Sequence, residues 1–336
     1  MKQAFKKSIK LFIFIGLAVI LLYAAFKKVD FAHLLDGLKN ADYSWVVFAI
    51  IASILGYLLR AARWNILIEP LGFNPSLKNT FHAVAVGYFA NLPVPRLGEV
   101  ARCAALGKSE KIPFNSLIGT VIIERAIDLL SLIIITVIVF FTNINMFGNF
   151  INEHILSGLG SKVQSLSGIG FILIIIATTI ITSIILLRIF HKKLIQIKFY
   201  SKIYNFMKGI FEGLKTIFQL KKAGLFFIYT LLMWGCYFLM VYLIFFSIPE
   251  TFNLTMLDGL FVLIAGSFGM TVPAPGGMGA YHLFVAKALL LYNIEYDSGI
   301  TYATLTHESQ TIMIIVVGII SASILYFRNK SLFSKD

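Results

Sequence analysis

The feature that most constrains this sequence is a series of apolar runs long enough to cross a lipid bilayer. A membrane-spanning helix needs about 20 mostly apolar residues. The chain is 58% hydrophobic and only 13% charged, whereas soluble domains carry about 25% charged residues. We therefore predict one all-α polytopic membrane domain over residues 1–336, with about six transmembrane helices. The predicted spans are residues 9–26, 43–66, 115–141, 169–190, 224–247 and 300–327.

The first run also has one property of a signal peptide, because lysines precede its apolar core. That core is long, however, and it ends at Lys27 and Lys28 without a clear small-residue cleavage pattern. An uncleaved membrane anchor is the favoured interpretation.

Two further apolar stretches are interrupted at their centres by a Pro-x-Pro sequence. They are residues 78–111, with Pro93 and Pro95, and residues 256–295, with Pro273 and Pro275. Two prolines this close cannot lie inside one continuous helix, because each removes an N–H donor and clashes with the preceding turn. The freed backbone groups cannot face lipid. We predict two re-entrant hairpins, although a kinked span is the alternative for the second stretch.

The lysines and arginines predict the orientation of the chain. With both termini cytoplasmic and neither hairpin crossing completely, 23 of the 29 basic residues fall on the cytoplasmic side. This count includes Arg60 and Arg63, and it agrees with the positive-inside rule. The two hairpins then enter from opposite sides. Paired interrupted segments of opposite orientation indicate an inverted repeat with a binding site at its interface.

The net charge of +13 and the basic loop at 191–222 point to a membrane surface. The charge is expected on loops that face anionic lipid, not on a nucleic-acid-binding surface. Residues 191–222 alternate basic and apolar positions, which favours an amphipathic helix on the inner leaflet over a partner-binding helix. Cys103 and Cys236 lie far apart in the chain and are interpreted as free thiols.

Ionisable residues follow the first break and recur in the third predicted span. Arg96 and Glu99 lie one turn apart if the second arm is helical, and the start of that arm offers backbone N–H groups. Arginine can hold a phosphate through a bidentate fork, so we expect a phosphate pocket centred on Arg96. The alternative is that these arginines lie at the cytoplasmic surface. Glu124 and Asp128 are expected to pair with Arg96 and Arg102, which is equally consistent with a structural ion network.

The second break combines glycines with two histidines. Gly276, Gly277 and Gly279 allow a close approach of the backbone to a ligand. His282 follows on the next arm, and it can meet His307 of the last span. Either histidine can titrate near neutral pH, although hydrogen bonding between helices is the commoner role for a histidine in a membrane.

Together, Asn91 to Arg102, Glu124 to Asp128 and Pro273 to Gly279 resemble the lysylphosphatidylglycerol synthase transmembrane region, or flippase-like domain, family. The resemblance covers nearly the whole chain. It implies a role in lipid translocation and does not imply synthase activity. The sequence departs from the family pattern at His282, and at His307 and Gln310 of the last span.

The resemblance and the breaks together predict a lipid translocator in the cytoplasmic membrane. The expected ligand is an anionic phospholipid or a lipid-linked headgroup, with no cofactor, no metal and no nucleic acid. We find no nucleotide-binding loop and no familiar hydrolase motif, so we expect no catalytic residues. A membrane-embedded transferase and a non-transporting subunit are the alternatives, and an oligomer is possible. The residues predicted to line the lipid site are Asn91, Pro93, Pro95, Arg96, Glu99, Arg102, Glu124, Arg125, Asp128, Pro273, Pro275, Gly276, Gly277, Gly279, His282 and His307.

Overall fold

A computed structural model describes the backbone of residues 2–143 and 220–333, with side chains from 13 to 143 and from 220 to 328. A few single positions between 178 and 204 are also described. The predicted span at 169–190 and nearly all of the loop at 191–222 lie outside the described residues. Every regular element among the described residues is helical, which confirms the predicted all-α class.

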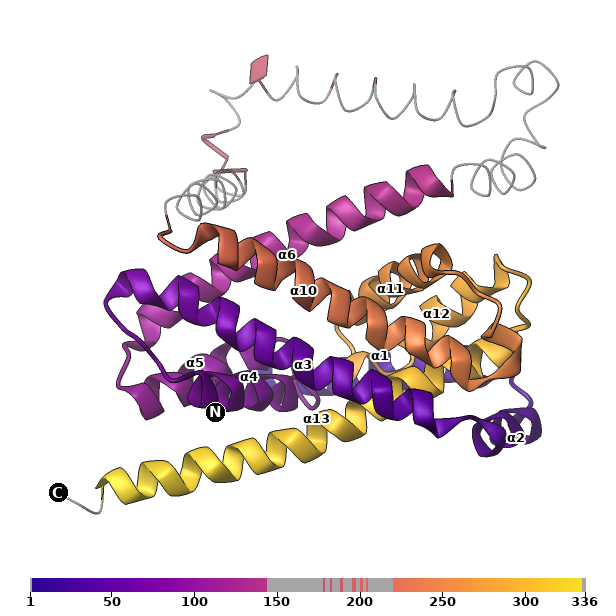
Figure 1. Ribbon diagram of the computed structural model, residues 1–336, viewed down its shortest axis with the longest axis horizontal. Helices are drawn as coiled ribbons and strands as arrows, with labels where there is room; N and C mark the ends of the chain where they lie inside the picture. The colour runs from indigo at the N-terminus through magenta and orange to yellow at the C-terminus, as the bar shows by residue number, and fades with distance from the viewer. Residues whose placement is uncertain are drawn as a thin grey trace. The chain divides into compact units, whose positions relative to one another are not determined.

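The chain divides into two compact units, residues 1–125 with 217–336, and residues 126–216. The first unit contains both interrupted stretches (Figure 1). The second is described chiefly through residues 126–143, where helix α6 continues. The helices are α1 (Lys2–Phe26), α2 (Phe31–Asn40), α3 (Tyr43–Ile68), α4 (Leu77–Asn91), α5 (Leu97–Glu110), α6 (Phe114–Thr142), α10 (Ala223–Tyr242), α11 (Met256–Thr271), α12 (Ala280–Leu290) and α13 (Tyr296–Phe333).

Three helices of the described chain are long and apolar enough to cross a membrane. They are Tyr43–Leu71, Ala223–Ser247 and Tyr296–Arg328, and each coincides with a predicted span. The apolar part of α1, Ile13–Phe26, is shorter. The Asp42 carboxylate caps α3 by accepting a hydrogen bond from the Ser44 N–H at 2.9 Å, so this helix begins where its apolar run begins.

The first interrupted stretch forms an antiparallel pair of helices, α4 and α5. Near the break, a Cβ built on Gly87 would lie only 2.9 Å from the Gly98 carbonyl oxygen. At the other end, the Ser76 hydroxyl donates to the Glu110 carboxylate at 3.0 Å. The arms therefore lie side by side along their length, and the break falls at the predicted prolines.

The second interrupted stretch forms a similar pair, α11 and α12. A Cβ on Gly269 would lie 2.9 Å from the Tyr281 Cα beside the break, while the Phe261 and Tyr292 rings are 5.7 Å apart at the open end. The two arms are therefore separate helices that pack against each other. The chain can turn back here because Gly276, Gly277 and Gly279 all adopt positive φ, where a side chain would be strained.

The two hairpins open toward opposite ends of α3 and α13. The open end of the first is held at the C-terminal ends of these helices, where Asn65 donates to the Pro75 carbonyl and Arg328 donates to Asn79. The open end of the second packs where α10 ends, since Gly259 touches Phe238 and Tyr242, and α10 runs antiparallel to α3.

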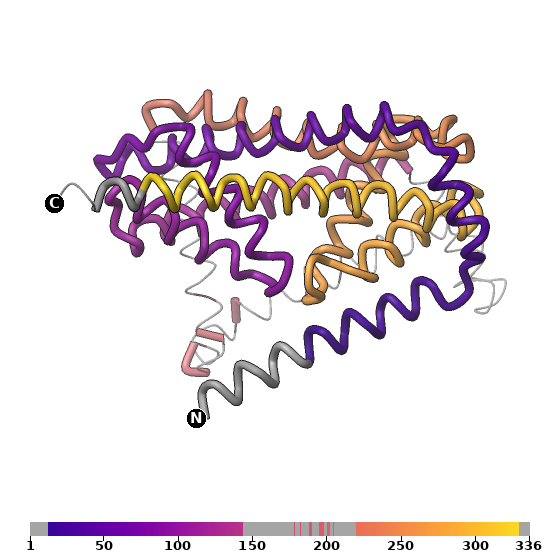
Figure 2. Tube along the Cα trace, turned by 90° about the horizontal axis from the view of Figure 1, so that it is seen from below, coloured from indigo at the N-terminus to yellow at the C-terminus, as the bar shows by residue number. Residues whose placement is uncertain are grey.

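The tips of the two hairpins meet midway along α13 (Figure 2). A Cβ on Gly276 would lie 3.5 Å from the Leu92 side chain, so the two breaks are in contact. His307 Nε2 of α13 donates a hydrogen bond to the Gly276 carbonyl oxygen at 2.8 Å. Gly318, farther along α13, packs against Phe89. Two breaks far apart in the sequence thus lie together in the middle of the first unit.

Candidate functional site

Three buried arginines surround a single buried carboxylate beneath the first hairpin. The Glu124 Oε1 atom of α6 lies 3.2 Å from Arg60 Nη1, 3.3 Å from Arg63 Nη2 and 3.2 Å from Arg102 Nη1. The exposed fractions of these side chains are 5% or less. The helices α3, α5 and α6 are therefore joined through one oxygen atom. We call these four residues the Glu124 cluster.

Aromatic and hydroxyl side chains hold the guanidinium groups in place. Arg60 Nε donates to the Tyr237 hydroxyl at 3.1 Å, and that hydroxyl lies 3.1 Å from the hydroxyl of Tyr88. The Arg102 guanidinium carbon lies 4.6 Å from the centre of the Trp64 ring. Trp64 is in turn fixed by donation from its indole nitrogen to Thr120 Oγ1 at 2.8 Å. These contacts leave little freedom to the charged groups.

The Glu124 cluster leaves part of the hydrogen-bonding capacity of Arg102 unused. The Arg102 side chain is buried, where an unsatisfied charged donor is costly. Within the part of the chain that the structure describes, Arg102 Nε and Nη2 have no hydrogen-bond partner. Arg102 therefore keeps two buried donors that an additional anion can use.

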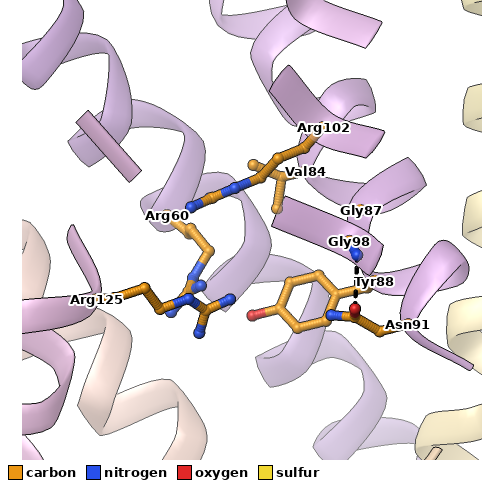
Figure 3. A pocket seen from close by; sticks show the side chains of 8 residues that line it. All are labelled: Arg60, Val84, Gly87, Tyr88, Asn91, Gly98, Arg102 and Arg125. Carbon is orange, nitrogen blue, oxygen red and sulfur yellow. Dashed lines mark hydrogen bonds between the residues drawn. The ribbon is translucent and has the colours of Figure 1, made fainter. Parts of the chain in front are cut away.

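A small pocket lies between this cluster and the first hairpin (Figure 3). Its lining residues are Arg60, Val84, Gly87, Tyr88, Asn91, Gly98, Arg102 and Arg125. Only about 10 Å³ is open to the centre of a water-sized sphere, which is room for about one water molecule. Beside it, Arg125 Nη2 pairs with Glu99 Oε1 at 2.7 Å, and the exposed fractions of these side chains are 46% and 25%.

The first break places Arg96 at the start of α5. Its φ is +67°, it is exposed, and it forms no ion pair with any residue that the structure describes. The N–H groups predicted to bind phosphate are partly used, because Gly98 donates to Asn91 Oδ1 at 2.6 Å and Leu97 donates to the Val94 carbonyl. Asn91 thus closes the hairpin tip, and Arg96 is not among the residues that line the pocket.

The second break lies beside the two predicted histidines. The rings of His282 and His307 are 5.0 Å apart, which confirms that these residues meet. His307 Nδ1 lies 3.0 Å from Glu308 Oε1, and His282 Nε2 lies 3.9 Å from the same oxygen. Both histidine side chains are buried, whereas the Glu308 side chain is 46% exposed.

The structure brings some of the predicted residues together and leaves others outside the cluster. Arg102 pairs with Glu124 as expected, but Arg125 pairs with Glu99, and Arg96 lies apart. Asp128 follows on α6 within the second unit. Pro93 and Pro95 form the turn at one tip, and Pro273 and Pro275 with the three glycines form the other.

Sequence reasoning missed the roles of Arg60 and Arg63. They were counted only among the basic residues predicted on the cytoplasmic side, and both are buried against Glu124. A signal was present, since the two arginines are three residues apart and so share one helix face inside an apolar run. Charges within a membrane span usually mark a function or a partner, and that rule applied to these two residues as well.

The comparison with known families decides the classification. The family described as Lysylphosphatidylglycerol synthase TM region matches residues 9–318. This chain belongs to that family. The predicted resemblance is therefore confirmed, and membership together with the long apolar helices assigns this protein of the lysylphosphatidylglycerol synthase TM region family to a membrane.

Several relatives carry the name UPF0104 membrane protein. The protein PH1989 of Pyrococcus horikoshii is 22% identical over 306 residues, which cover 85% of this chain and 88% of the relative. MJ1078 of Methanocaldococcus jannaschii is 30% identical over 69% of this chain and 92% of its own length. MJ1595 of the same organism is 36% identical over 94 residues, 27% of this chain and 28% of the relative. No solved structure matches the chain significantly.

Proposed function

We propose that this protein translocates a phospholipid or a lipid-linked headgroup across the cytoplasmic membrane. The observation that carries the proposal is the buried guanidinium group of Arg102, which pairs with Glu124 and keeps two unused donors. A lipid phosphate has the charge and the oxygen acceptors that these donors require. Membership of a family named after a lipid synthase supports the same ligand class.

The hairpins supply the route in this proposal. The four arms have 11 to 16 residues and are about 17–24 Å long as helices, shorter than a hydrocarbon core of about 30 Å. We interpret both hairpins as re-entrant elements of an inverted repeat whose tips meet near the membrane midplane. Broken helices at that depth are tolerated where they are buried in protein or line a water-filled cavity.

Arg96 fits this arrangement as the first contact of the headgroup. It is exposed at a hairpin tip and carries a charge that cannot face hydrocarbon. A polar passage beside the tip satisfies this requirement. The headgroup passes Arg96 and then reaches Arg102 and Arg60.

Entry of a phosphate requires the first hairpin to move. The space beside Arg102 holds about one water molecule in the conformation described, and Gly87 and Gly98 hold α4 and α5 in close contact. The structure therefore corresponds to a closed state in this proposal. Both termini are cytoplasmic, as the distribution of basic residues predicts.

The test is transport of fluorescent phospholipids in vesicles that contain the purified protein. Lipids with different headgroups are placed in both leaflets, and a membrane-impermeant quencher reports the exchange between leaflets. We expect Arg102→Lys to lower the rate about tenfold or more, because lysine keeps the charge but loses the guanidinium donors. Lys108→Gln, an exposed basic position on the same helix, is the matched control and should transport normally.

Three outcomes separate the alternatives. No acceleration by the wild-type protein over the whole lipid panel contradicts the proposed function. Full activity of Arg102→Lys contradicts only the phosphate site. A chemically altered lipid, detected by mass spectrometry, supports a transferase in place of a translocator.

A further inference from the structure

His307 lies between two hydrogen-bond acceptors. Its Nε2 atom is 2.8 Å from the Gly276 carbonyl oxygen, and its Nδ1 atom is 3.0 Å from Glu308 Oε1. A carbonyl oxygen only accepts, so Nε2 must carry the proton. Neutral imidazole has one protonated nitrogen, and Nδ1 then directs a lone pair at a carboxylate oxygen. Two electron-rich atoms at 3.0 Å require a positive species between them.

His282 supplies a third donor atom to the same point. Its Nε2 atom lies 3.9 Å from Glu308 Oε1, and the ligand atoms of His282, His307 and Glu308 all lie within 4.8 Å of one another. The His282 side chain is 3% exposed, and its Nδ1 atom has no hydrogen-bond partner among the described residues. A proton shared between His307 and Glu308 would satisfy those two side chains, but it would not account for the buried imidazole of His282 beside them.

We propose that His282, His307 and Glu308 bind a divalent transition-metal ion, with Zn²⁺ as the reference ion. Zinc lies about 2.0–2.2 Å from histidine nitrogen and carboxylate oxygen, so two ligands at the tetrahedral angle lie about 3.3–3.6 Å apart. The separation between His307 Nδ1 and Glu308 Oε1 is 3.0 Å, so these two atoms need to move apart only slightly to share an ion. His282 needs only a small movement toward Glu308 to join them.

The surroundings of the three ligands suit a metal site. The Gly276 carbonyl accepts the other ring N–H of His307, which is the usual way in which a protein orients a metal-binding histidine. The half-exposed Glu308 provides an entrance for the ion and leaves a coordination position for water or a ligand. Two nitrogen ligands and one oxygen ligand suit zinc and its neighbours rather than Mg²⁺ or Ca²⁺.

A bound ion fixes the second hairpin to α13. Gly276 belongs to the hairpin tip, and His282 to its second arm, whereas His307 and Glu308 belong to α13. The ion therefore bridges the broken segment and the long helix that packs against it. This inference does not depend on the proposed transport function.

The test measures metal binding by the full-length protein in detergent, after removal of any affinity tag and of bound metal with a chelator. Zn²⁺ binding is followed by equilibrium dialysis with elemental analysis, and Co²⁺ is used as a spectroscopic substitute. We expect one Zn²⁺ per chain and visible absorption from Co²⁺. Glu308→Gln and His282→Gln should each weaken Zn²⁺ binding about tenfold or more. Losing a residue that merely orients a metal ligand already lowers affinity about tenfold or more, and losing the ligand itself should cost at least as much.

Glu295→Gln is the matched control, because Glu295 is an exposed carboxylate outside the cluster, and it should bind like the wild type. Two substitutions in different helices keep the test valid if one variant fails to fold. The absence of saturable Zn²⁺ binding overturns the proposal and leaves a shared proton as the positive species. Wild-type affinity in both folded variants also overturns it.

Discussion

The substitution Glu124→Gln tests the central charge cluster most directly. Glutamine keeps the size and the acceptor oxygen of the side chain but removes its negative charge. Arg60, Arg63 and Arg102 then lose the carboxylate that they share, and the exposed fractions of their side chains are 5% or less. We expect a large loss of stability from a change that alters almost no volume.

The ion-pair distances set the size of the expected loss in the free energy of unfolding. An ion pair at 3.2 Å is worth about 5 kcal/mol at an effective dielectric constant of about 20. Repulsion among the arginines and the cost of dehydration offset much of this attraction. Removing one partner of a buried pair costs about 3–5 kcal/mol. For a domain of roughly this size, a loss of 1 kcal/mol in the free energy of unfolding lowers the melting temperature by about 2–4 °C. The melting temperature of Glu124→Gln should therefore fall by at least about 6 °C.

The assay is thermal unfolding in detergent with a thiol-reactive dye, because Cys103 and Cys236 are both free and buried. Glu99→Gln is the matched control. It removes the same charge from a partly exposed pair with Arg125, and such pairs contribute about 0–1 kcal/mol. Equal midpoints for the two variants would refute the reasoning. Adding Arg102→Gln to Glu124→Gln should restore part of the lost stability, because one unbalanced cation is removed.

Two further predictions concern packing and orientation. Gly98→Ala places a methyl group against the Gly87 carbonyl oxygen and Asn91, so it should lower stability by about 1–3 kcal/mol in the same assay. Gly119→Ala has open space around the new methyl group, and an equal loss there would contradict the packing argument. In intact cells, a membrane-impermeant maleimide should label Lys39→Cys but not Lys335→Cys, and the reverse pattern would contradict the cytoplasmic placement of the termini.

The positions of both breaks were determined by the sequence alone. Two prolines within three residues prevent a continuous helix wherever they occur, and the helices end at these positions. The long spans were also predictable, because apolar length is a local property. The meeting of His282 and His307 was foreseen only as a possibility, since their distance depends on how α12 packs against α13.

The partners of the charged residues were decided by the tertiary structure. Helix periodicity shows which residues of one helix share a face. It gives no information on the rotation of one helix against another, and that rotation directs Arg125 to Glu99. The same rotation brings Arg60 and Arg63 to Glu124, a pairing that the sequence did not predict.

The sequence therefore determined where this chain enters apolar surroundings and where its helices must break, because both follow from local chemistry. Only the tertiary structure decided that the breaks of the two hairpins meet through Leu92 and Gly276. It also decided that three arginines share one carboxylate. The physical reason is that a buried charge must find its partner among whatever side chains packing brings near it, and those neighbours come from helices distant in the sequence.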